Sequence, residues 1–487
     1  MAVTTVTELL DFFKAHSIEY LDMRFTDLRG IEHALTIPAS AFTEESAAEG
    51  FAFDGSSIDG FATVDESDML LRPDISTAYI DPFRARKTVN MKFFVHKPDS
   101  AETPYARDPR SIARSAEEYL RKTGIADTCY IGCEAEFFVF DSVRYSTAVN
   151  SAFHHVDSDE GWWRSGEKTM INGEPNRGNQ INLSDGYFPV APYDKTIAVR
   201  DEIAHHLSGC GFEVERFHHE IATGGVQEIN YKFNTLLGAG DDLQTFKYIV
   251  KNTAESMGQT ATFMPKPLEN DGGCGMHAHQ SLWKNGEPLF AGDGYAGLSE
   301  IALWYIGGLL KHAGAVLAFT NPTANSYRRL YSGFEAPVNL AYSESNRSAA
   351  IRIPAAGKTP AAKRLEFRAP DPSGNPYLGF AAQLLAGLDG IQNKIDPGAP
   401  ADFDLSAAAS NPHCSNQPHQ NARTVERVPY SLERSLEALD TDREFLTRTG
   451  VFSDELIDSH IQLKYDKEII PLRTGPTPKE FELYYNV

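Results

Sequence analysis

A chain of 487 residues is too long for one hydrophobic core to be the default, so we expect a small domain joined to a larger one. Its formal net charge of −22 at pH 7 disfavours nucleic acid and anionic membrane surfaces as partners, because both require a basic surface. Five scattered cysteines and the lack of a long apolar stretch predict a cytoplasmic protein without disulfides or membrane helices.

The first hundred residues combine one helical pattern with strand-like runs. Residues 4–13 predict an amphipathic helix with Thr7 as a possible cap, and residues 20–25 and 89–95 are typical of strands. Residues 96–110 contain three prolines among Asp, Ser and Thr, which is typical of a linker. We therefore expect a first domain to end within this segment.

Beyond the linker, short polar-faced strands alternate with longer helical patterns, as at residues 201–210, 241–257 and 298–318. This balance is typical of an α+β fold rather than of regular βαβ units. Residues 399–423 are rich in Ala, Ser, Asn, Pro and His, and predict a mobile surface loop. The predicted domains are residues 1–105 and 106–487.

Acidic side chains alternate along the strand predicted over residues 128–141. Because successive side chains of a strand point to opposite faces, Glu134 and Glu136 share one face. Two such carboxylates on a buried strand repel each other unless cations or arginines compensate, whereas a solvated acidic edge explains this strand alone equally well. Cys129 and Cys133 fall on the opposite face, which favours packing over zinc binding.

Three later segments, residues 214–233, 276–282 and 363–368, show a similar clustering of polar side chains. The side chains concerned are Glu215, Glu220, Glu228, Phe233, His277, His279, Ser281, Arg364, Glu366 and Arg368. Each segment alone has an ordinary structural explanation, such as a cross-strand salt-bridge ladder. Together they predict strands that line a common concave surface.

Convergence of the glutamates would create a strongly acidic site. Glu134, Glu136, Glu220, Glu228 and Glu366 would bring five negative charges together, and His277 would add a neutral nitrogen. Ligation dominated by oxygen, with one imidazole and no cysteine, suits Mg²⁺ or Mn²⁺ better than structural zinc. Two divalent ions would offset about four of these charges, as in a two-metal clamp for phosphoryl transfer.

Arginine supplies the complementary charge over a short part of the chain. The cluster contains Arg329, Arg347, Arg352, Arg364 and Arg368. Guanidinium groups bind carboxylates and phosphates in bidentate fashion, so this cluster fits a polyphosphate and an acidic substrate. The sequence contains no P-loop and no dinucleotide-binding glycine motif, which excludes those modes of nucleotide binding.

These motifs resemble glutamine synthetase type I along essentially the whole chain. The strings that carry the resemblance include FDGSSIDGF from Phe53, EAEFFVF from Glu134, HHEIATGGVQE from His218, GMHAHQSLW from Gly275, NSYRRL from Asn325, KRLEFRAPD from Lys363 and EFELYYNV from Glu480. The order and spacing of so many strings make the resemblance specific.

The resemblance implies a fold and a reaction. The fold is a small N-terminal β-grasp domain plus a larger catalytic domain, whose curved antiparallel sheet forms a funnel-shaped active site. The reaction is ATP-dependent ligation of ammonium to the γ-carboxylate of L-glutamate through γ-glutamyl phosphate. The family also implies two or more Mg²⁺ or Mn²⁺ ions per subunit and a homododecamer of two stacked hexameric rings with active sites between subunits.

The resemblance also assigns roles to residues of this chain. One metal ion would be held by Glu136, Glu220 and Glu228, and the other by Glu134, His277 and Glu366. The implied catalytic residues are Asp54, Glu335, Arg347 and Arg368. Glutamate would contact Arg329, Gly273, Tyr187 and Arg368. ATP would contact Glu215, Phe233, His279, Ser281, Arg352 and Arg364.

Three positions depart from the family pattern. Gly272 stands where many members have asparagine, and Ala361 stands where several have lysine. Residues 142–166 match the insertion of the subtype controlled by adenylylation, but the modified tyrosine aligns with Ser406, so we expect no adenylylation.

Two alternatives stay open at this point. One is a γ-glutamyl ligase for ethanolamine or a polyamine, which the acidic pair Asp54 and Glu335 disfavours because a larger amine needs a remodelled pocket. The other is a catalytically silent ring protein.

Overall fold

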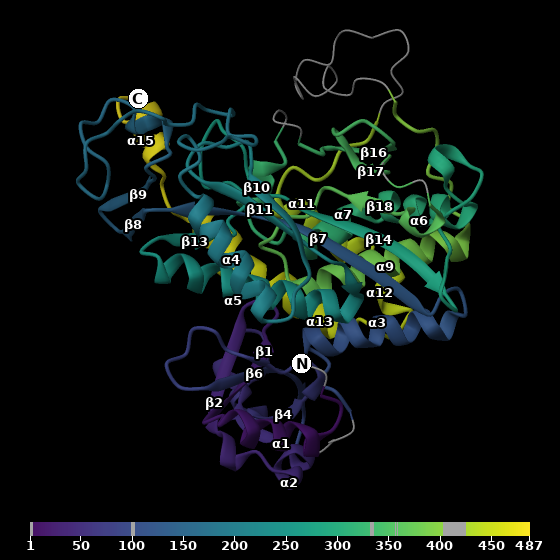
Figure 1. The fold of residues 1–487 in the computed structure, drawn as a ribbon. Coiled ribbons are helices and arrows are strands. Elements are labelled where there is room, and N and C mark those ends of the chain that lie inside the picture. Colours follow the sequence, from purple (N-terminus) through teal and green to yellow (C-terminus); the bar gives the residue numbers. More distant parts are fainter. Residues whose placement is uncertain (1–2, 99–102, 332–335, 356, 358, 403–424) are drawn as a thin grey trace.

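The computed structural model describes residues 3–98, 103–331, 336–355, 357, 359–402 and 425–487. Glu335, Ser406 and most of the loop predicted over residues 399–423 therefore lie outside the described residues. A small N-terminal domain lies against one side of a larger domain, and the two are built on separate sheets (Figure 1).

The N-terminal sheet has six strands in the order β2-β1-β6-β4-β3, with β5 on β6. Its strands are β1 Tyr20–Thr26, β2 Glu32–Pro38, β3 Phe51–Asp54, β4 Asp68–Pro73, β5 Tyr79–Ile80 and β6 Thr88–His96. Two helices, α1 Val6–His16 and α2 Glu44–Glu49, belong to the same domain. The parallel pair β1 and β6 confirms both predicted strands, and the domain is the expected β-grasp.

The cap of α1 differs from the predicted one. Thr5, not Thr7, precedes the helix, and its hydroxyl accepts a hydrogen bond from the backbone of Glu8 at 3.2 Å. The Glu8 carboxylate accepts the backbone N–H of Thr5 in return, at 3.0 Å. This reciprocal capping box needs a spacing of three residues, which only Thr5 has. Thr7 instead donates its hydroxyl to Glu44 of α2 at 2.7 Å.

The larger domain is built on a ten-stranded sheet in the order β10-β11-β7-β14-β18-β17-β16, with β12 and β13 on β7 and β15 on β14. Its strands are β7 Thr128–Phe140, β10 Val214–His219, β11 Val226–Tyr231, β12 Asn234–Thr235, β13 Thr260–Thr262, β14 Met276–Lys284, β15 Glu287–Pro288, β16 Asn339–Ser343, β17 Ala349–Arg352 and β18 Leu365–Phe367. A separate hairpin joins β8 Ser142–Ala148 to β9 Ser151–Asp157.

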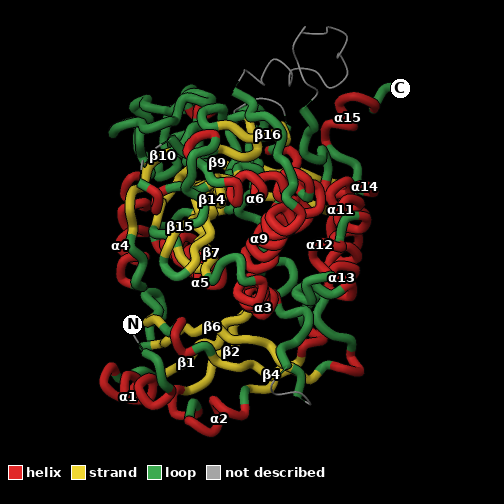
Figure 2. The backbone as a smooth tube through the Cα atoms, turned by 90° about the vertical axis from the view of Figure 1, so that its right-hand side faces the viewer, coloured by secondary structure: helices red, strands yellow, loops and turns green. Residues whose placement is uncertain are grey.

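Most helices of the larger domain pack against one face of this sheet (Figures 1 and 2). The helices of this domain are α3 Pro109–Thr123, α4 Ile197–Gly209, α5 Leu236–Ser256, α6 Glu300–Lys311, α7 Ala313–Thr320, α8 Ser326–Arg329, α9 Pro376–Asn393, α11 Leu432–Thr441, α12 Glu444–Thr447, α13 Asp454–Lys464, α14 Ile470–Thr474 and α15 Pro478–Tyr484, of which α15 lies apart from the sheet. The mixed α+β class is confirmed, and α9 is buried over nearly its whole length.

The helix predicted over residues 298–318 is wrong, because the chain bends by 75° between α6 and α7. His312 sits at the bend with φ −96° and ψ 7°. Its ring nitrogens lie 2.7 Å from the Asp442 carboxylate and 2.9 Å from that of Asp389, so two carboxylates hold it there. Within the described residues, no single helix has the length and apolarity to span a membrane, although this bent pair passes on length and composition.

A buried ion triad joins the two domains. Arg110, in the first turn of α3, donates two hydrogen bonds to Asp241 of α5, at 2.8 and 2.7 Å. A third bond runs from Arg110 to Asp74 of the N-terminal domain at 2.6 Å. The Arg110 side chain is 2% exposed, so its charge depends on these two carboxylates for compensation.

We expect Arg110→Ala to lower the free energy of unfolding by about 3–5 kcal/mol, because it leaves a buried carboxylate without its counter-charge. Urea denaturation measures this change. Arg121→Ala is the matched control on the same helix, since Arg121 is half exposed and lies 3.9 Å from Glu117. The control substitution should lower the free energy of unfolding by less than about 1 kcal/mol. Equal losses of unfolding free energy in the two variants would contradict the role of the triad.

Candidate active site

The strand register brings the candidate residues into one row across the sheet. Glu136 of β7 is the cross-strand partner of Glu228, which in turn faces His218 of β10. Glu134 of β7 is the partner of His277. On the other side of β14, His279 is paired with Glu366 of β18, and Glu366 with Arg352 of β17. Directly paired residues project from the same face, so the row forms one polar surface.

The first half of the row surrounds Glu134. Its carboxylate lies 3.2 Å from Nδ1 of His277 and 2.9 Å from Nε2 of His279. His277 Nδ1 is also 3.5 Å from the fully buried Glu366. Ligand atoms of Glu134, His279 and Glu366 lie within 4.8 Å of one another, so these three could hold one cation. His279 is therefore close enough to act beside the predicted set of Glu134, His277 and Glu366.

The second half of the row brings Glu220 and Glu228 together with His218. Single atoms of these three side chains again lie within 4.8 Å of one another. The ring of His218 is 3.5 Å from Glu220 and 3.6 Å from Glu228. Glu136 accepts the backbone N–H of Gly275 at 2.7 Å. This group is the second candidate cation site.

The pKa values of the two halves shift in opposite directions. Loss of hydration, followed by the charges of Glu220 and Glu228, raises the pKa of Glu136 well above its usual range. The same loss of hydration, with the charge of Glu228, raises the pKa of Glu220 to about 7. Burial also opposes ionisation of Glu134, but hydrogen bonds from His277 and His279 lower its pKa overall. The second half therefore carries under-compensated acid, which is the condition that favours a cation.

Glu366 is the best compensated acid of the row. Arg352 donates to one of its oxygens at 2.5 Å, and Arg368 donates to the other at 2.6 Å. Although burial acts to raise it, the nearby His277, His279 and these two arginines hold the pKa of Glu366 below its usual value. Glu366 thus connects the acidic row to the arginine cluster.

The remaining arginines surround the same surface. Arg329 is held by the carbonyl oxygens of Ala369 at 2.9 Å, Pro370 at 3.1 Å and Arg368 at 3.1 Å. Arg364 donates to Nδ1 of His279 at 3.1 Å. The backbone carbonyl of Arg347 accepts a hydrogen bond from Arg368 at 3.2 Å. All five arginines of the predicted cluster thus lie around the β14, β17 and β18 strands.

The glycines before β14 allow the backbone to approach Arg329. A Cβ on Gly275 would lie 2.5 Å from Nη2 of Arg329, and one on Gly273 would lie 2.4 Å from the carbonyl of Pro265. A Cβ on Gly272 would lie 2.8 Å from Ile221. Glycine at positions 273 and 275 leaves main-chain groups beside Arg329, where a small substrate could bind them.

Other candidate residues lie at the rim. Phe233 is 52% exposed and packs edge-on against Tyr130, with ring centroids 5.1 Å apart. Glu215 is exposed on β10, and Ser281 accepts the indole N–H of Trp283 at 3.0 Å. Tyr187 is 54% exposed and stacks on Phe188 at 4.0 Å. These side chains have room for a ligand to contact them.

Asp54 is not part of the row. It ends β3 of the N-terminal sheet and is exposed, and its carboxylate accepts hydrogen bonds from Ser56 at 2.6 Å and Ser57 at 2.7 Å. These serines lower the pKa of Asp54. Asp54 is thus a predicted site residue that the single chain does not bring to the acidic row, whereas Glu335 lies outside the described residues.

His218 is a site residue that we did not predict from the sequence. It is two positions before Glu220 on a strand, so the alternation that singled out Glu134 and Glu136 also applied to it. A buried histidine beside it, His219, was missed as well, and alternation could not have found it because it points to the other face.

Comparisons with known proteins agree with this geometry. The family model for the glutamine synthetase catalytic domain matches residues 106–484, and the model for the glutamine synthetase beta-Grasp domain matches residues 17–98. The chain is 54% identical to the glutamine synthetase of Mycolicibacterium smegmatis over 488 residues, which covers 100% of both. It is 55% identical to that of Streptomyces coelicolor over 477 residues, which covers 98% of each. The cryo-EM structure of Plasmodium falciparum glutamine synthetase superposes with a TM-score of 0.90 at 31% identity, covering 100% of this chain and 99% of that one.

The raised pKa of Glu220 predicts that the metal-free protein loses stability as the pH rises through about 7. Between about pH 4.5 and 7 the folded state holds a proton that the unfolded chain has released, so stability decreases with pH over that window by on the order of 3 kcal/mol. Glu220→Gln should flatten this profile and raise the melting temperature at pH 8. Thermal melts in a chelator from pH 5 to 8 test this, and identical profiles would contradict the assignment.

Proposed function

Because the chain belongs to the glutamine synthetase family, it makes glutamine from glutamate and ammonium with ATP and a divalent metal, and we propose that six side chains hold two such ions. The proposed ligands are Glu136, Glu220 and Glu228 for one ion and Glu134, His277 and Glu366 for the other. The observation that carries the proposal is the row of cross-strand partners on one face of the sheet. His218 and His279 are close enough to act beside them.

The chemistry of this donor set fits Mg²⁺ or Mn²⁺. Carboxylate oxygens outnumber nitrogens and form a hard, anionic set, and cysteine is absent from it. The raised pKa values of Glu136 and Glu220 point to acids that lack a full counter-charge. When bound, divalent ions would polarise the ATP phosphates and offset the charge that develops on the transferred phosphoryl group.

Glutamate is proposed to bind beside the glycines that precede β14. Arg329 would pair with its α-carboxylate, since its guanidinium is oriented by three backbone carbonyls. The main chain at Gly273 would accept a hydrogen bond from the amino group of glutamate, because no side chain fits at this position. Tyr187 would cover the substrate, and Arg368 would reach the γ-carboxylate. The reacting carboxylate would then lie next to Glu366, which Arg368 contacts at 2.6 Å.

ATP is proposed to lie along β14, β17 and β18. Arg352 and Arg364 would contact its phosphates, and the exposed ring of Phe233 offers an apolar face for the base. The proposed contacts of His279, Ser281 and Glu215 complete this end of the site. ATP would convert the unreactive γ-carboxylate to an acyl phosphate, with Arg347 and Arg368 stabilising the negative charge.

Ammonium must lose a proton before it can attack the acyl phosphate, and Asp54 is the proposed base. Its lowered pKa keeps it ionised and able to hold a cation. Because Asp54 lies on the other sheet of its own chain, we propose that it serves the site of a neighbouring subunit. Glu335, as part of a loop that excludes water, would accept a further proton.

The protein forms a homo-oligomer, as its family does, and we propose a dodecamer of two stacked hexameric rings. The exposed apolar residues of α15 support it, because Phe481 and Tyr484 are 57% and 58% exposed in the single chain. We also propose a cytoplasmic location and a domain boundary between residues 105 and 106. The alternative of another amine as substrate gains no support, because the relatives compared are glutamine synthetases over their full length.

Ammonium should be the preferred nitrogen donor. With glutamate, ATP and Mn²⁺ or Mg²⁺, we expect phosphate release that depends on ammonium. The kcat/KM values with ethanolamine or spermidine should be at least about 10²-fold lower, because a larger amine needs a remodelled pocket. A coupled phosphate assay with varied nitrogen source measures this. Equal rates with a larger amine would contradict the assignment. If no phosphate is released with any amine, the result would instead support the alternative of a catalytically silent protein.

Glu366→Ala should reduce turnover by more than about 10²-fold, because it removes a metal ligand and the partner of Arg352 and Arg368. The same variant should bind less Mn²⁺ per subunit in calorimetry. Glu287→Ala, on the exposed strand β15 of the same sheet, is the matched control and should behave like the parent protein. Near-normal turnover of Glu366→Ala would refute the two-ion proposal.

A further inference from the structure

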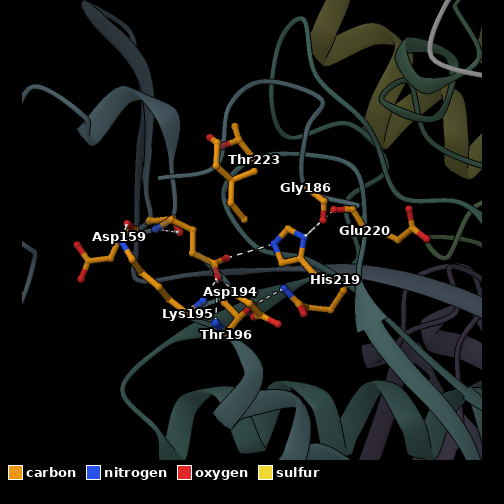
Figure 3. A network of polar contacts seen from close by, with 12 residues as sticks. Asp159, Gly186, Asp194, Lys195, Thr196, His219, Glu220 and Thr223 are labelled. Atoms are coloured by element: carbon orange, nitrogen blue, oxygen red, sulfur yellow. Dashed lines mark hydrogen bonds and ion pairs between the residues drawn. The ribbon is translucent and has the colours of Figure 1, made fainter. Parts of the chain in front are cut away.

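A buried histidine lies directly behind the second cation site. His219 is the last residue of β10, and its side chain is fully buried next to the proposed ligand Glu220. Its Nδ1 lies 2.8 Å from the carbonyl oxygen of Gly186 and 2.6 Å from that of Glu220 (Figure 3). A carbonyl oxygen can only accept, so Nδ1 carries a hydrogen and donates to both.

The other ring nitrogen faces Glu160. Nε2 of His219 lies 3.3 Å from the Glu160 carboxylate, whose side chain is 1% exposed. The second oxygen of Glu160 accepts the backbone N–H of Thr196 at 2.9 Å and that of Lys195. These bonds fix Glu160 to the start of α4, so the imidazole is held from both sides.

The support extends to β11. The hydroxyl of Thr196 accepts from Gln227 at 2.9 Å and from Arg200 at 3.0 Å. Arg200 is in turn paired with Asp194 and bonded to Gln227. Gln227 precedes the proposed ligand Glu228, so the network braces the backbone of both strands that carry this cation site.

The same histidine holds the segment that carries Tyr187. The backbone N–H of Gly186 donates to Ile221 at 2.9 Å, and that of Phe188 donates to the carbonyl of His219 at 3.3 Å. A Cβ on Gly186 would lie 2.8 Å from the carbonyl of Glu220 and 2.9 Å from the ring of His219. Gly186 therefore lets residues 186–188 lie directly against the end of β10.

We propose that the Glu160–His219 pair is a positioning device that fixes the backbone of Glu220 for metal binding and holds Tyr187 over the glutamate site. This inference rests on the proposed function, because it assumes that Glu220 is a metal ligand and Tyr187 a substrate contact. Neither His219 nor Glu160 touches the reacting atoms. They act through the main chain of Glu220 and Gly186, which both depend on the Nδ1 donor.

Two substitutions at the same position separate the donor from the volume of the ring. Asparagine places an amide N–H near Nδ1, whereas glutamine places its amide near Nε2, toward Glu160. We expect His219→Gln to weaken Mn²⁺ binding by about 10–100-fold and to raise KM for glutamate more than it lowers kcat. His219→Asn should recover Mn²⁺ affinity to within about threefold of the parent, because the carbonyl bonds are kept.

Calorimetric titration of the chelator-treated full-length protein with Mn²⁺ gives the main readout, and it does not depend on turnover. His460→Gln is the matched control. His460 is a buried histidine of α13, and its ring bonds one carbonyl oxygen, that of Ala318, at 2.9 Å. It should lower the melting temperature without changing Mn²⁺ affinity. Equal loss of Mn²⁺ affinity in His219→Gln and His460→Gln, or unchanged affinity in His219→Gln, would overturn the proposal.

Glu160 and Glu220 variants complete the test. Glu160→Gln keeps an acceptor for Thr196 and should bind Mn²⁺ nearly normally, whereas Glu160→Ala should resemble His219→Gln. If His219→Gln fails to fold, a normal Mn²⁺ affinity in Glu160→Ala overturns the proposal. Glu220→Gln must itself lose Mn²⁺ binding. If Glu220→Gln still binds Mn²⁺ normally, the proposed ligand assignment fails. If Glu220→Gln loses Mn²⁺ binding while His219→Gln binds Mn²⁺ normally, only the positioning role fails.

Discussion

The repulsion between carboxylates on neighbouring strands is the constraint on which the rest of the site depends. Glu136, Glu220 and Glu228 lie where water is scarce, and the charges of the last two raise the cost of ionising Glu136. The charge of Arg329 offsets only part of this cost. The strand pairing is nevertheless kept by the hydrophobic opposite face of β7, whose buried residues are Cys129, Ile131, Cys133, Ala135 and Phe137. A sheet stabilised from behind can thus present charges in front that would not assemble by themselves.

The negative charge of the carboxylates is compensated differently in the two halves of the row. Around Glu134 and Glu366, histidines and arginines supply the compensation, and the pKa of each carboxylate is lowered. Around Glu136 and Glu220 the compensation from His218 and Arg329 is incomplete, and the pKa values rise. The second half therefore depends more on a bound cation, and the precise course of its backbone matters more. The Glu160–His219 support lies behind this half.

Alternation along strands was enough to predict most of the row from the sequence. Glu134, Glu136, His277, His279 and Glu366 follow a period of two, and the sheet pairs them as neighbours. Periodicity could not find His219, because its role depends on Gly186 and Glu160, which are distant in sequence and joined to it only by tertiary contacts. It also could not find the bend at His312, because the carboxylates of Asp389 and Asp442 that hold it come from two other helical segments. Local pattern predicts which face a side chain takes, whereas the partner behind that face is set by topology.

The separation of Asp54 from the acidic row follows from the same electrostatics. A carboxylate added to the row within one chain would meet the field of five glutamates, and its pKa would rise as that of Glu136 does. On the N-terminal sheet, Asp54 is exposed and accepts hydrogen bonds from Ser56 and Ser57, which keep it ionised. In the proposed oligomer, delivery of such a group by a neighbouring subunit would allow it to meet ammonium while already charged. Assembly of the oligomer would thereby supply the base in a protonation state that the interior of one chain would not maintain.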